Sequence, residues 1–156
     1  MRIFLRTVCA VSVLSFVGTL WALNSRFQKR PERVTPSELY QVVQRHLAAC
    51  RSADFPRAYH SAANEVQERF SLVQFEKKLR REYQPVAGAD HIEFGAVHRK
   101  RDDIRRTLVD VYFIAQTGEA VGWTYVLVFE DGDWKVDHGD PIPGWPTGQR
   151  LSGIRI

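Results

Sequence analysis

The spacing of apolar residues divides the chain into a helical first half and a second half made of strands. From residue 36 to residue 83 apolar side chains recur every three or four positions, which is typical of amphipathic helices. Helices are expected at 36–51, 56–63, 64–70 and 71–83. Pro85 should end the last of them, because proline disfavours the helical conformation of the residue before it.

Two of the predicted helix starts carry a capping box, in which two side chains three residues apart cap the first turn. The pairs are Thr35 with Glu38, and Ser71 with Gln74. His46 lies on the apolar face of the first helix. A buried or half-buried histidine is therefore expected there, in preference to a ligand-binding one.

From residue 91 onward apolar and polar residues alternate, which predicts β-strands. Four strands are expected, at 91–99, 105–116, 120–130 and 134–138. Gly118 and the pair Asp131-Gly132 supply the residues that tight hairpin turns favour. Three prolines between residues 140 and 148 predict that the sheet does not continue past residue 138, because proline cannot donate to a ladder.

Helices followed by an antiparallel meander predict an α+β fold, with N-terminal helices packed on a curved, mainly antiparallel sheet of about four strands. On the first strand Ile92, Phe94 and Ala96 should share one face. The bulky residues of the third strand should all face the helices: Val121, Trp123, Tyr125, Leu127 and Phe129. The second strand is apolar on both sides, which fits either a strand buried on both faces or a sheet that meets a partner.

An uncharged run at residues 7–23 follows a short basic tip and predicts a single membrane-spanning helix before the domain. Counted from Ile3 the run has 21 residues, with Arg6 able to reach the interface. A cleaved signal peptide, which would make the protein secreted, is the alternative, but small residues for a cleavage site are poorly placed. Membrane anchoring through residues 3–23 is therefore favoured.

The basic residues on the two sides of this run are nearly balanced, and the positive-inside rule alone tilts towards a cytoplasmic domain. The order of a basic tip and then an apolar core is that of an export signal, so an extracytoplasmic domain of a single-pass membrane protein is expected. The organisation is an anchor at 1–23, a basic linker at 24–34, a domain at 35–142 and an extended Pro/Gly-rich tail at 143–156. Trp145 could act as a clasp in that tail.

The positive charge of the chain is concentrated near the predicted anchor. The chain has 22 Lys and Arg against 18 Asp and Glu, and residues 1–34 hold six of these bases and one of the acids. The remaining 16 bases and 17 acids leave the domain near neutrality, so no binding to nucleic acid is expected. Cys50 is expected to be a small, buried and unreactive side chain.

Two stretches carry a resemblance to a known superfamily. One is the helical pattern that contains Leu47-Ala-Ala-Cys50 and Asp54-Phe-Pro-Arg-Ala-Tyr59, and the other is the closing hairpin Phe129-Glu-Asp-Gly-Asp-Trp134-Lys-Val136. Together they resemble the nuclear transport factor 2-like superfamily, which includes ketosteroid isomerases and polyketide cyclases, and in particular its small membrane-anchored or exported bacterial members. The resemblance covers residues 37–142 and implies a cone formed by a curved sheet. The extra strand pair usual in that superfamily has no counterpart here.

The resemblance implies that an enzyme of this superfamily would place a carboxylate or a histidine inside the cone. Asp110 is the catalytic candidate, because it stands alone among the apolar residues of the second strand. Inside the cavity it would be desolvated, as a general base requires. The alternative is an acid on an open rim, paired with an arginine such as Arg106.

Aromatic residues of the predicted cone are candidates for binding a ligand, and core packing is the alternative for each. They are Tyr59, Phe94, Tyr112, Trp123 and Tyr125. The histidines and aspartates of the strands lack the spacing of zinc ligands, so no metal site is expected. No dinucleotide fingerprint, phosphate loop or serine-hydrolase motif is present, and no cofactor is expected.

These features predict a membrane-anchored, non-catalytic module that binds a protein partner or a small apolar ligand. The alternative is a small acid/base enzyme, of the isomerase, dehydratase or cyclase type, that uses Asp110 with a tyrosine. A cone filled by Phe94, Phe113 and Trp123 would count against the enzyme. The open face of the sheet could also support a homodimer.

Overall fold

A computed structural model of the chain describes residues 34–83, 87–99, 102–145 and 149–150. The predicted anchor at 1–23 and nearly all of the predicted linker at 24–34 lie outside the described residues, as do parts of the tail. In the described ranges, no helix combines the length and the apolar character that crossing a membrane requires.

Four helices come first along the chain: α2 (Pro36–Arg51), α3 (Phe55–His60), α4 (Asn64–Arg69) and α5 (Leu72–Glu82). Both predicted capping boxes are confirmed. The hydroxyls of Thr35 and Ser71 accept the backbone N–H of Glu38 and Gln74, and these two side chains accept the backbone N–H of their capping residue in return.

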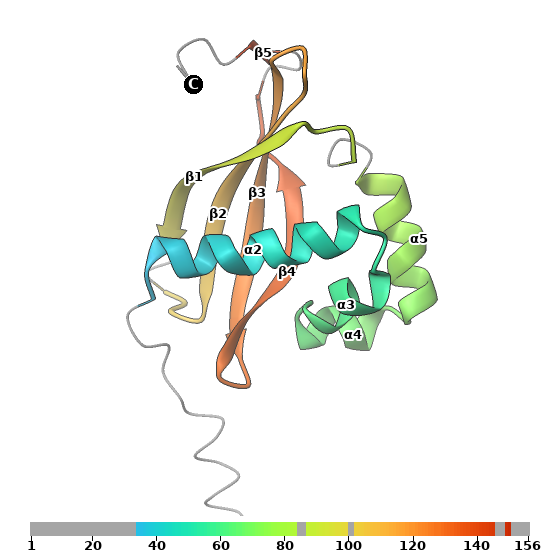
Figure 1. Cartoon of the computed structure of the whole chain (residues 1–156). Coiled ribbons are helices and arrows are strands. Elements are labelled where there is room, and N and C mark those ends of the chain that lie inside the picture. Colours follow the sequence, from blue (N-terminus) through green and yellow to red (C-terminus); the bar gives the residue numbers. More distant parts are fainter. Residues whose placement is uncertain (1–33, 84–86, 100–101, 146–148, 151–156) are drawn as a thin grey trace, which may run out of the picture.

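An antiparallel meander follows the helices: β1 (His91–Arg99), β2 (Arg106–Ile114), β3 (Glu119–Glu130) and β4 (Asp133–Pro141). The strands lie in the order β1-β2-β3-β4, and the two-residue strand β5 (Gln149–Arg150) pairs with the beginning of β3. Figure 1 shows α2 crossing in front of this sheet. The predicted α+β architecture, with helices packed on an antiparallel sheet, is confirmed.

Two details of the strands differ from the prediction. A bulge between Phe94 and Val97 moves Ala96 out of the face that it was expected to share with Phe94, and Val97 pairs with Val109 instead. The sheet also does not end at residue 138. β4 continues to Pro141, which pairs with Trp123, and proline is tolerated there because it is the last residue of the strand.

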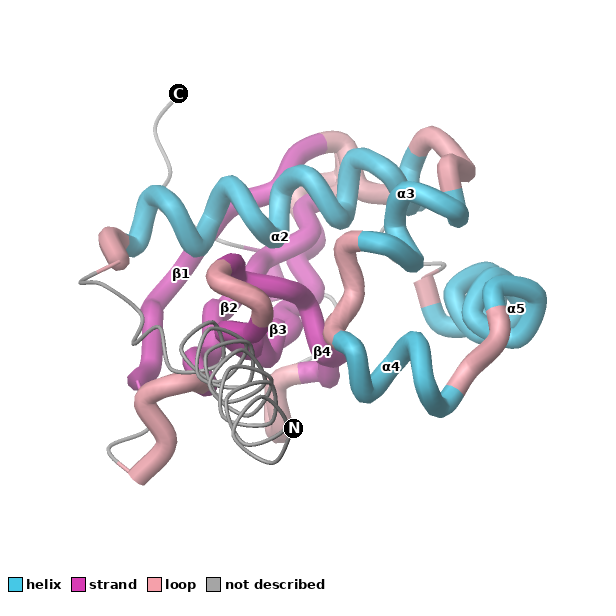
Figure 2. The backbone as a smooth tube through the Cα atoms, turned by 90° about the horizontal axis from the view of Figure 1, so that it is seen from below, coloured by secondary structure: helices cyan, strands magenta, loops and turns pink. Residues whose placement is uncertain are grey.

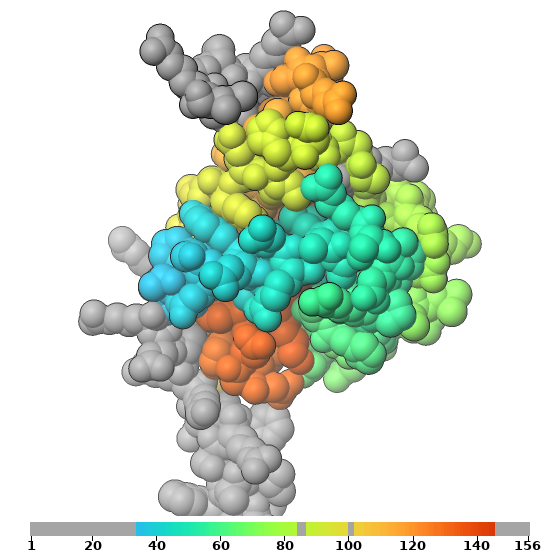
Figure 3. Space-filling model, in the orientation of Figure 1, coloured from blue at the N-terminus to red at the C-terminus, as the bar shows by residue number. Residues whose placement is uncertain are grey.

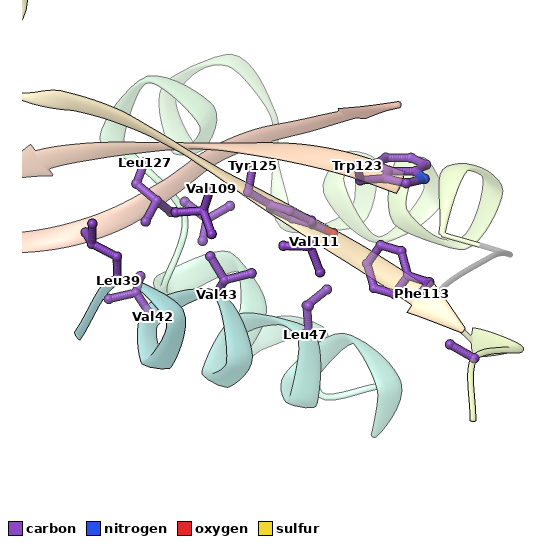
Figure 4. Close-up of a cluster of buried hydrophobic side chains, with 12 residues drawn as sticks. Leu39, Val42, Val43, Leu47, Val109, Val111, Phe113, Trp123, Tyr125 and Leu127 are labelled. Atoms are coloured by element: carbon purple, nitrogen blue, oxygen red, sulfur yellow. The ribbon is translucent and has the colours of Figure 1, made fainter. Parts of the chain in front are cut away.

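The main core lies between α2 and one face of β2 and β3, called the inner face below (Figure 4). Of the third-strand residues expected here, Trp123, Tyr125 and Leu127 are buried in it and Val121 packs at its margin, whereas Phe129 is half-buried against Trp134. The buried residues that meet them come from α2 and β2: Leu39, Val42, Val43, Leu47, Val109, Val111 and Phe113.

A second, smaller core joins the end of α2 to α3 and α5, through Ala49, Phe55, Ala58, Ala62, Phe75 and Leu79. Figure 2 shows these short helices grouped beside β4 at one end of α2, and Figure 3 shows helices covering much of this side of the molecule. Between α3 and α4 the chain pairs with the edge of β4, where Ala63 N–H donates to the Val136 carbonyl at 2.8 Å.

The opposite face of the sheet, called the outer face, carries the half-buried residues Leu108, Asp110 and Tyr112. The Trp145 ring covers part of it, since a Cβ added to Gly122 would lie 3.0 Å from that ring. The Trp145 Nε1–H donates to the Ala120 carbonyl at 3.1 Å. Trp145 therefore lies on the outer face, and among the described helices β2 is covered on its inner face alone.

The two faces should respond differently to truncation of a leucine. Leu127→Ala should lower the free energy of unfolding by about 2–5 kcal/mol, because Leu127 is fully buried on the inner face. Leu108→Ala, the matched change on the outer face, should cost about 1 kcal/mol or less. Urea unfolding of the full-length chain at two protein concentrations measures both. A large, concentration-dependent loss for Leu108→Ala would instead show that a second copy covers the outer face.

Candidate functional site

A cleft of about 350 Å³ opens between α4, α5 and β4, and we call it the β4 cleft. Its apolar lining comes mainly from the short helices: Ala62, Val66, Phe70, Phe75, Leu79 and Tyr83. Its polar lining comes from four elements: His46 of α2, Arg69 of α4, Lys78 and Glu82 of α5, and Asp137, His138 and Asp140 of β4. The arrangement is an apolar wall faced by a polar strand edge.

The helical wall of the cleft follows from local spacing and from one contact with the sheet. Phe75, Leu79 and Glu82 recur at three- and four-residue intervals on α5, so they share one side of the helix. The helix α4 has no side-chain cap of its own. Glu130 of β3 supplies a carboxylate that accepts the Asn64 backbone N–H at 2.5 Å, as suits the first turn of a helix.

The strand side of the cleft is set by a bulge in β4. Val136 pairs with Leu127 and His138 with Val126, so Asp137 lies between them without a partner residue in the ladder. Its side chain is 11 % exposed and lies 3.4 Å from Arg106 Nη1 and 3.2 Å from His138 Nδ1. The bulge thus presents a largely buried carboxylate whose charge is balanced by an arginine.

His46 is the most buried polar side chain of the lining, with 2 % exposure. Its Nδ1 lies 3.0 Å from the Ser61 hydroxyl oxygen. Burial lowers the pKa of His46 to about 4, and the Ala58 carbonyl opposes that shift in part. The sequence-based expectation of a buried histidine is confirmed. Its place in a cleft was missed, because no signal in α2 tells where α4, α5 and β4 will lie.

The ionic groups on the helical wall largely satisfy one another. Lys78 Nζ lies 2.7 Å from Glu82, and Arg69 pairs with Glu65 one helical turn away. Hydrogen bonds and charge from Lys78 and Arg81 together outweigh the cost of burial and lower the pKa of Glu82. These pairs leave the wall nearly neutral, which suits a ligand without strong charge.

A second cavity, of about 310 Å³, shares the lining residues Leu79 and Tyr83 with the β4 cleft. It contains Cys50, whose pKa burial raises to about 12, so the thiolate that a nucleophile needs is not formed near neutral pH. The Arg80 guanidinium in its wall lies 4.5 Å from the centre of the Phe55 ring and is paired with Glu76.

The structure places Asp110, the predicted catalytic candidate, on the outer face and not in the β4 cleft. Its two carboxylate oxygens lie 2.9 Å from His98 Nε2 and 2.8 Å from the Thr124 hydroxyl, which donates to it. Arg106, the partner suggested by sequence, pairs with Asp137 and other acids. Asp110 thus forms a small polar cluster on the sheet surface.

Tyr112 is brought close to Asp110, as the acid/base hypothesis requires, but on the same outer face. Its ring centre lies 4.9 Å from that of Trp145. Burial, and to a lesser degree the charge of Asp110, raise the pKa of Tyr112. The pair does not face the helices, so it lies outside the interior of the cone that the resemblance implied.

The other four ligand-binding candidates serve packing. Trp123 and Tyr125 are buried in the main core beside Phe113, and Phe94 packs at its margin, with its ring 4.8 Å from that of Tyr40. The Tyr59 hydroxyl is shared between the Gln67 and Phe70 carbonyls at 2.9 and 2.7 Å. None of these four is among the described residues that line the two cavities. The filled interior counts against an enzyme built around Asp110.

Within the described ranges, no three side chains of His, Cys, Asp or Glu are arranged to hold a metal ion. The His138 ring bridges Asp137 and Asp140, with nitrogen-to-oxygen distances of 3.2 and 3.5 Å. These contacts account for the polar strand edge as a network of polar contacts within the protein itself.

A family model described as a domain of unknown function, DUF4864, matches residues 33–138, which is more than half of the chain. The chain belongs to the DUF4864 family. The match includes α2 to α5 and the first part of β4, and with them His46 and most of the β4 cleft. No curated protein and no solved structure matches the chain significantly.

The buried histidine of this DUF4864 chain should make stability depend on pH. His46 has an ordinary pKa of 6.5 and a folded-state pKa of about 4, so the unfolded chain binds more protons between these values. Stability should therefore fall as the pH drops through this range. From pH 7 to pH 4.5 the wild type should lose about 2 kcal/mol more than His46→Gln, measured by urea unfolding. Equal losses would contradict a neutral buried His46.

A buried tyrosine, Tyr125, and a half-buried one, Tyr59, should respond differently to loss of the hydroxyl. The Tyr125 hydroxyl is buried, and among the described residues no group is in hydrogen-bond geometry with it, although the Tyr83 hydroxyl is near enough to help raise its pKa. Tyr125→Phe should leave the free energy of unfolding unchanged or raise it. Tyr59→Phe should lower it by about 1 kcal/mol, because that hydroxyl donates to backbone carbonyls. Thermal and urea unfolding test the pair, and a clear loss for Tyr125→Phe would reveal a hidden partner.

Proposed function

We propose that this DUF4864 protein is a non-catalytic binding module whose β4 cleft takes a small, mainly apolar ligand. The observation that carries the proposal is the cleft itself, with a wall of Val66, Phe70, Phe75 and Leu79. Ligand sites in proteins are typically concave, apolar and furnished with a few polar groups that set orientation. The β4 cleft has these properties, and the outer face around Asp110 has no comparable enclosure among the described residues.

The chemistry of the cleft favours binding over catalysis. Lys78 and Glu82 neutralise each other, and Asp137 is held by Arg106. His46 has a pKa of about 4, so it is a weak base near neutral pH. The acid/base alternative depends on Asp110 and Tyr112, which lie together on the outer face. That pair has no shared apolar cavity in the described part of the chain, so the alternative has less support.

The membrane anchor and the family resemblance belong to the same proposal. Residues 3–23 would hold the domain at a membrane surface, with the domain on the extracytoplasmic side. The arrangement of helices on one face of an antiparallel sheet supports a nuclear transport factor 2-like domain, although four strands and a two-residue fifth are fewer than a full cone. The cleft would then bind a ligand that is available at, or close to, that surface.

Binding should be visible residue by residue. The full-length chain in lipid nanodiscs, with labelled Val and Leu methyl groups, is titrated with indole, a small apolar ring that dissolves in water. NMR shifts should saturate at Val66, Leu79 and Val136, with a dissociation constant of about 1 mM or below. Methyl groups of the outer face, such as those of Leu108 and Val128, should not move. This internal control separates binding from partition into lipid.

Two matched substitutions decide whether indole binds in the β4 cleft. Val66→Trp fills the cleft from α4 and should abolish the shifts at Leu79 and Val136. Val73→Trp makes the same change on the flank of α5, where the side chain is 75 % exposed, and should leave binding intact. Equal shifts on both faces of the sheet, or binding that survives Val66→Trp, would refute the proposed function.

A further inference from the structure

The hydrogen bonds behind His46 determine which of its ring nitrogens carries a proton. The Ser61 hydroxyl has one proton, and it donates that proton to the Ala58 carbonyl at 2.8 Å. With its proton placed on the Ala58 carbonyl, Ser61 accepts in its 3.0 Å contact with His46 Nδ1. A neutral His46 then carries its proton on Nδ1, which leaves the lone pair of Nε2 able to accept a hydrogen bond.

The groups around the ring maintain this state. Burial keeps the imidazole neutral, so Nε2 is not protonated near neutral pH. The Ala58 carbonyl also accepts a hydrogen bond from the ring, and it lies 2.8 Å from Ser61 Oγ, the contact of Nδ1. Among the described residues, Ser61 supplies the one side-chain hydrogen bond of His46, and that bond uses Nδ1. The structure thus contains a buried acceptor that its own side chains do not use.

The surroundings of His46 in the cleft make that acceptor selective. Ala62, Val66, Leu79 and Val136 line the cleft with it and offer no competing side-chain donors. The cations of the wall, Arg69 and Lys78, are already paired with glutamates. A ligand that enters without a donor would leave Nε2 unpaired and shielded from water, which is unfavourable.

We infer that His46 selects ligands of the β4 cleft that donate a hydrogen bond, so the ligand class is an apolar molecule that carries an N–H or O–H group. The inference rests on the proposed function, because it assigns the chemistry of the same cleft. It gives His46 a role in specificity, which the position of this residue on the apolar face of α2 did not suggest.

The test compares indole with 1-methylindole, which differs by replacement of the donor N–H with N–CH₃. Both are titrated into the full-length chain in nanodiscs and followed at the Val66 and Leu79 methyl groups. Indole should bind about 3- to 10-fold more tightly, the range that one hydrogen bond supports. Equal affinities would overturn the inference and leave the proposed function standing. If neither compound shifts these methyl groups, the proposed function itself fails.

A variant and a direct observation of the ring complete the test. In His46→Phe, which offers no acceptor, the two compounds should bind with equal affinity, and a preference for indole that persists would overturn the inference. Long-range ¹H–¹⁵N spectra of the wild type decide the same question if the variant does not fold. They should show the His46 proton on Nδ1, and the Nε2 signal should move with indole and not with 1-methylindole. A proton found on Nε2 would overturn the inference.

Discussion

The rest of the structure depends on the pairing of residues 61–63 with the edge of β4. Val136 N–H donates to the Ser61 carbonyl at 3.3 Å, and Ala63 N–H donates to the Val136 carbonyl at 2.8 Å. These bonds satisfy an edge strand that would otherwise present free backbone groups, and they fix the point from which α4 departs. The same pairing holds Ser61 under His46 and sets the distance between the short helices and β4. The cleft exists because of this contact.

The interior shows how tightly the space between α2 and the sheet is filled. Trp123 and Tyr125 both bury a polar atom there that has no hydrogen-bond partner among the described residues, so these rings contribute through apolar area in spite of their polar groups. Tyr125 also packs under Gly139, where a Cβ would approach its ring to 3.0 Å. A side chain at this position of β4 would push the strand away from the core, so glycine here is a consequence of the large neighbouring ring.

Much of the fold was predictable because its signals are local. The capping boxes at Thr35 and Ser71 fix two helix starts, and Asp131 and Gly132 adopt the positive φ values, 55° and 87°, that a tight hairpin turn needs. The alternation of residues along β3 was enough to predict which of its side chains face α2.

The site was less predictable, because it depends on contacts between distant residues. The bulges at Gly95 and Asp137 are set by neighbouring strands, and no repeat in the sequence marks them. A Cβ at Gly95 would lie 2.7 Å from the Tyr112 ring, a contact that only the folded sheet reveals. Asp110 was a catalytic candidate because it is a charged residue among apolar ones. The strand β2 has apolar residues on both faces, so its sequence pattern does not show which face the helices cover. His46 was placed correctly on its helix, and its role depends on three elements that come later in the chain.

The position of Trp145 has a consequence for how the sheet can meet another molecule. Its ring occupies the space above Gly122 and lies against Tyr112, so a side chain of the protein itself already covers that part of the outer face. A second copy or a partner protein approaching β2 and β3 would meet this indole before it met the strands. Any molecule that bound this part of the outer face would therefore have to contact or displace the Trp145 ring.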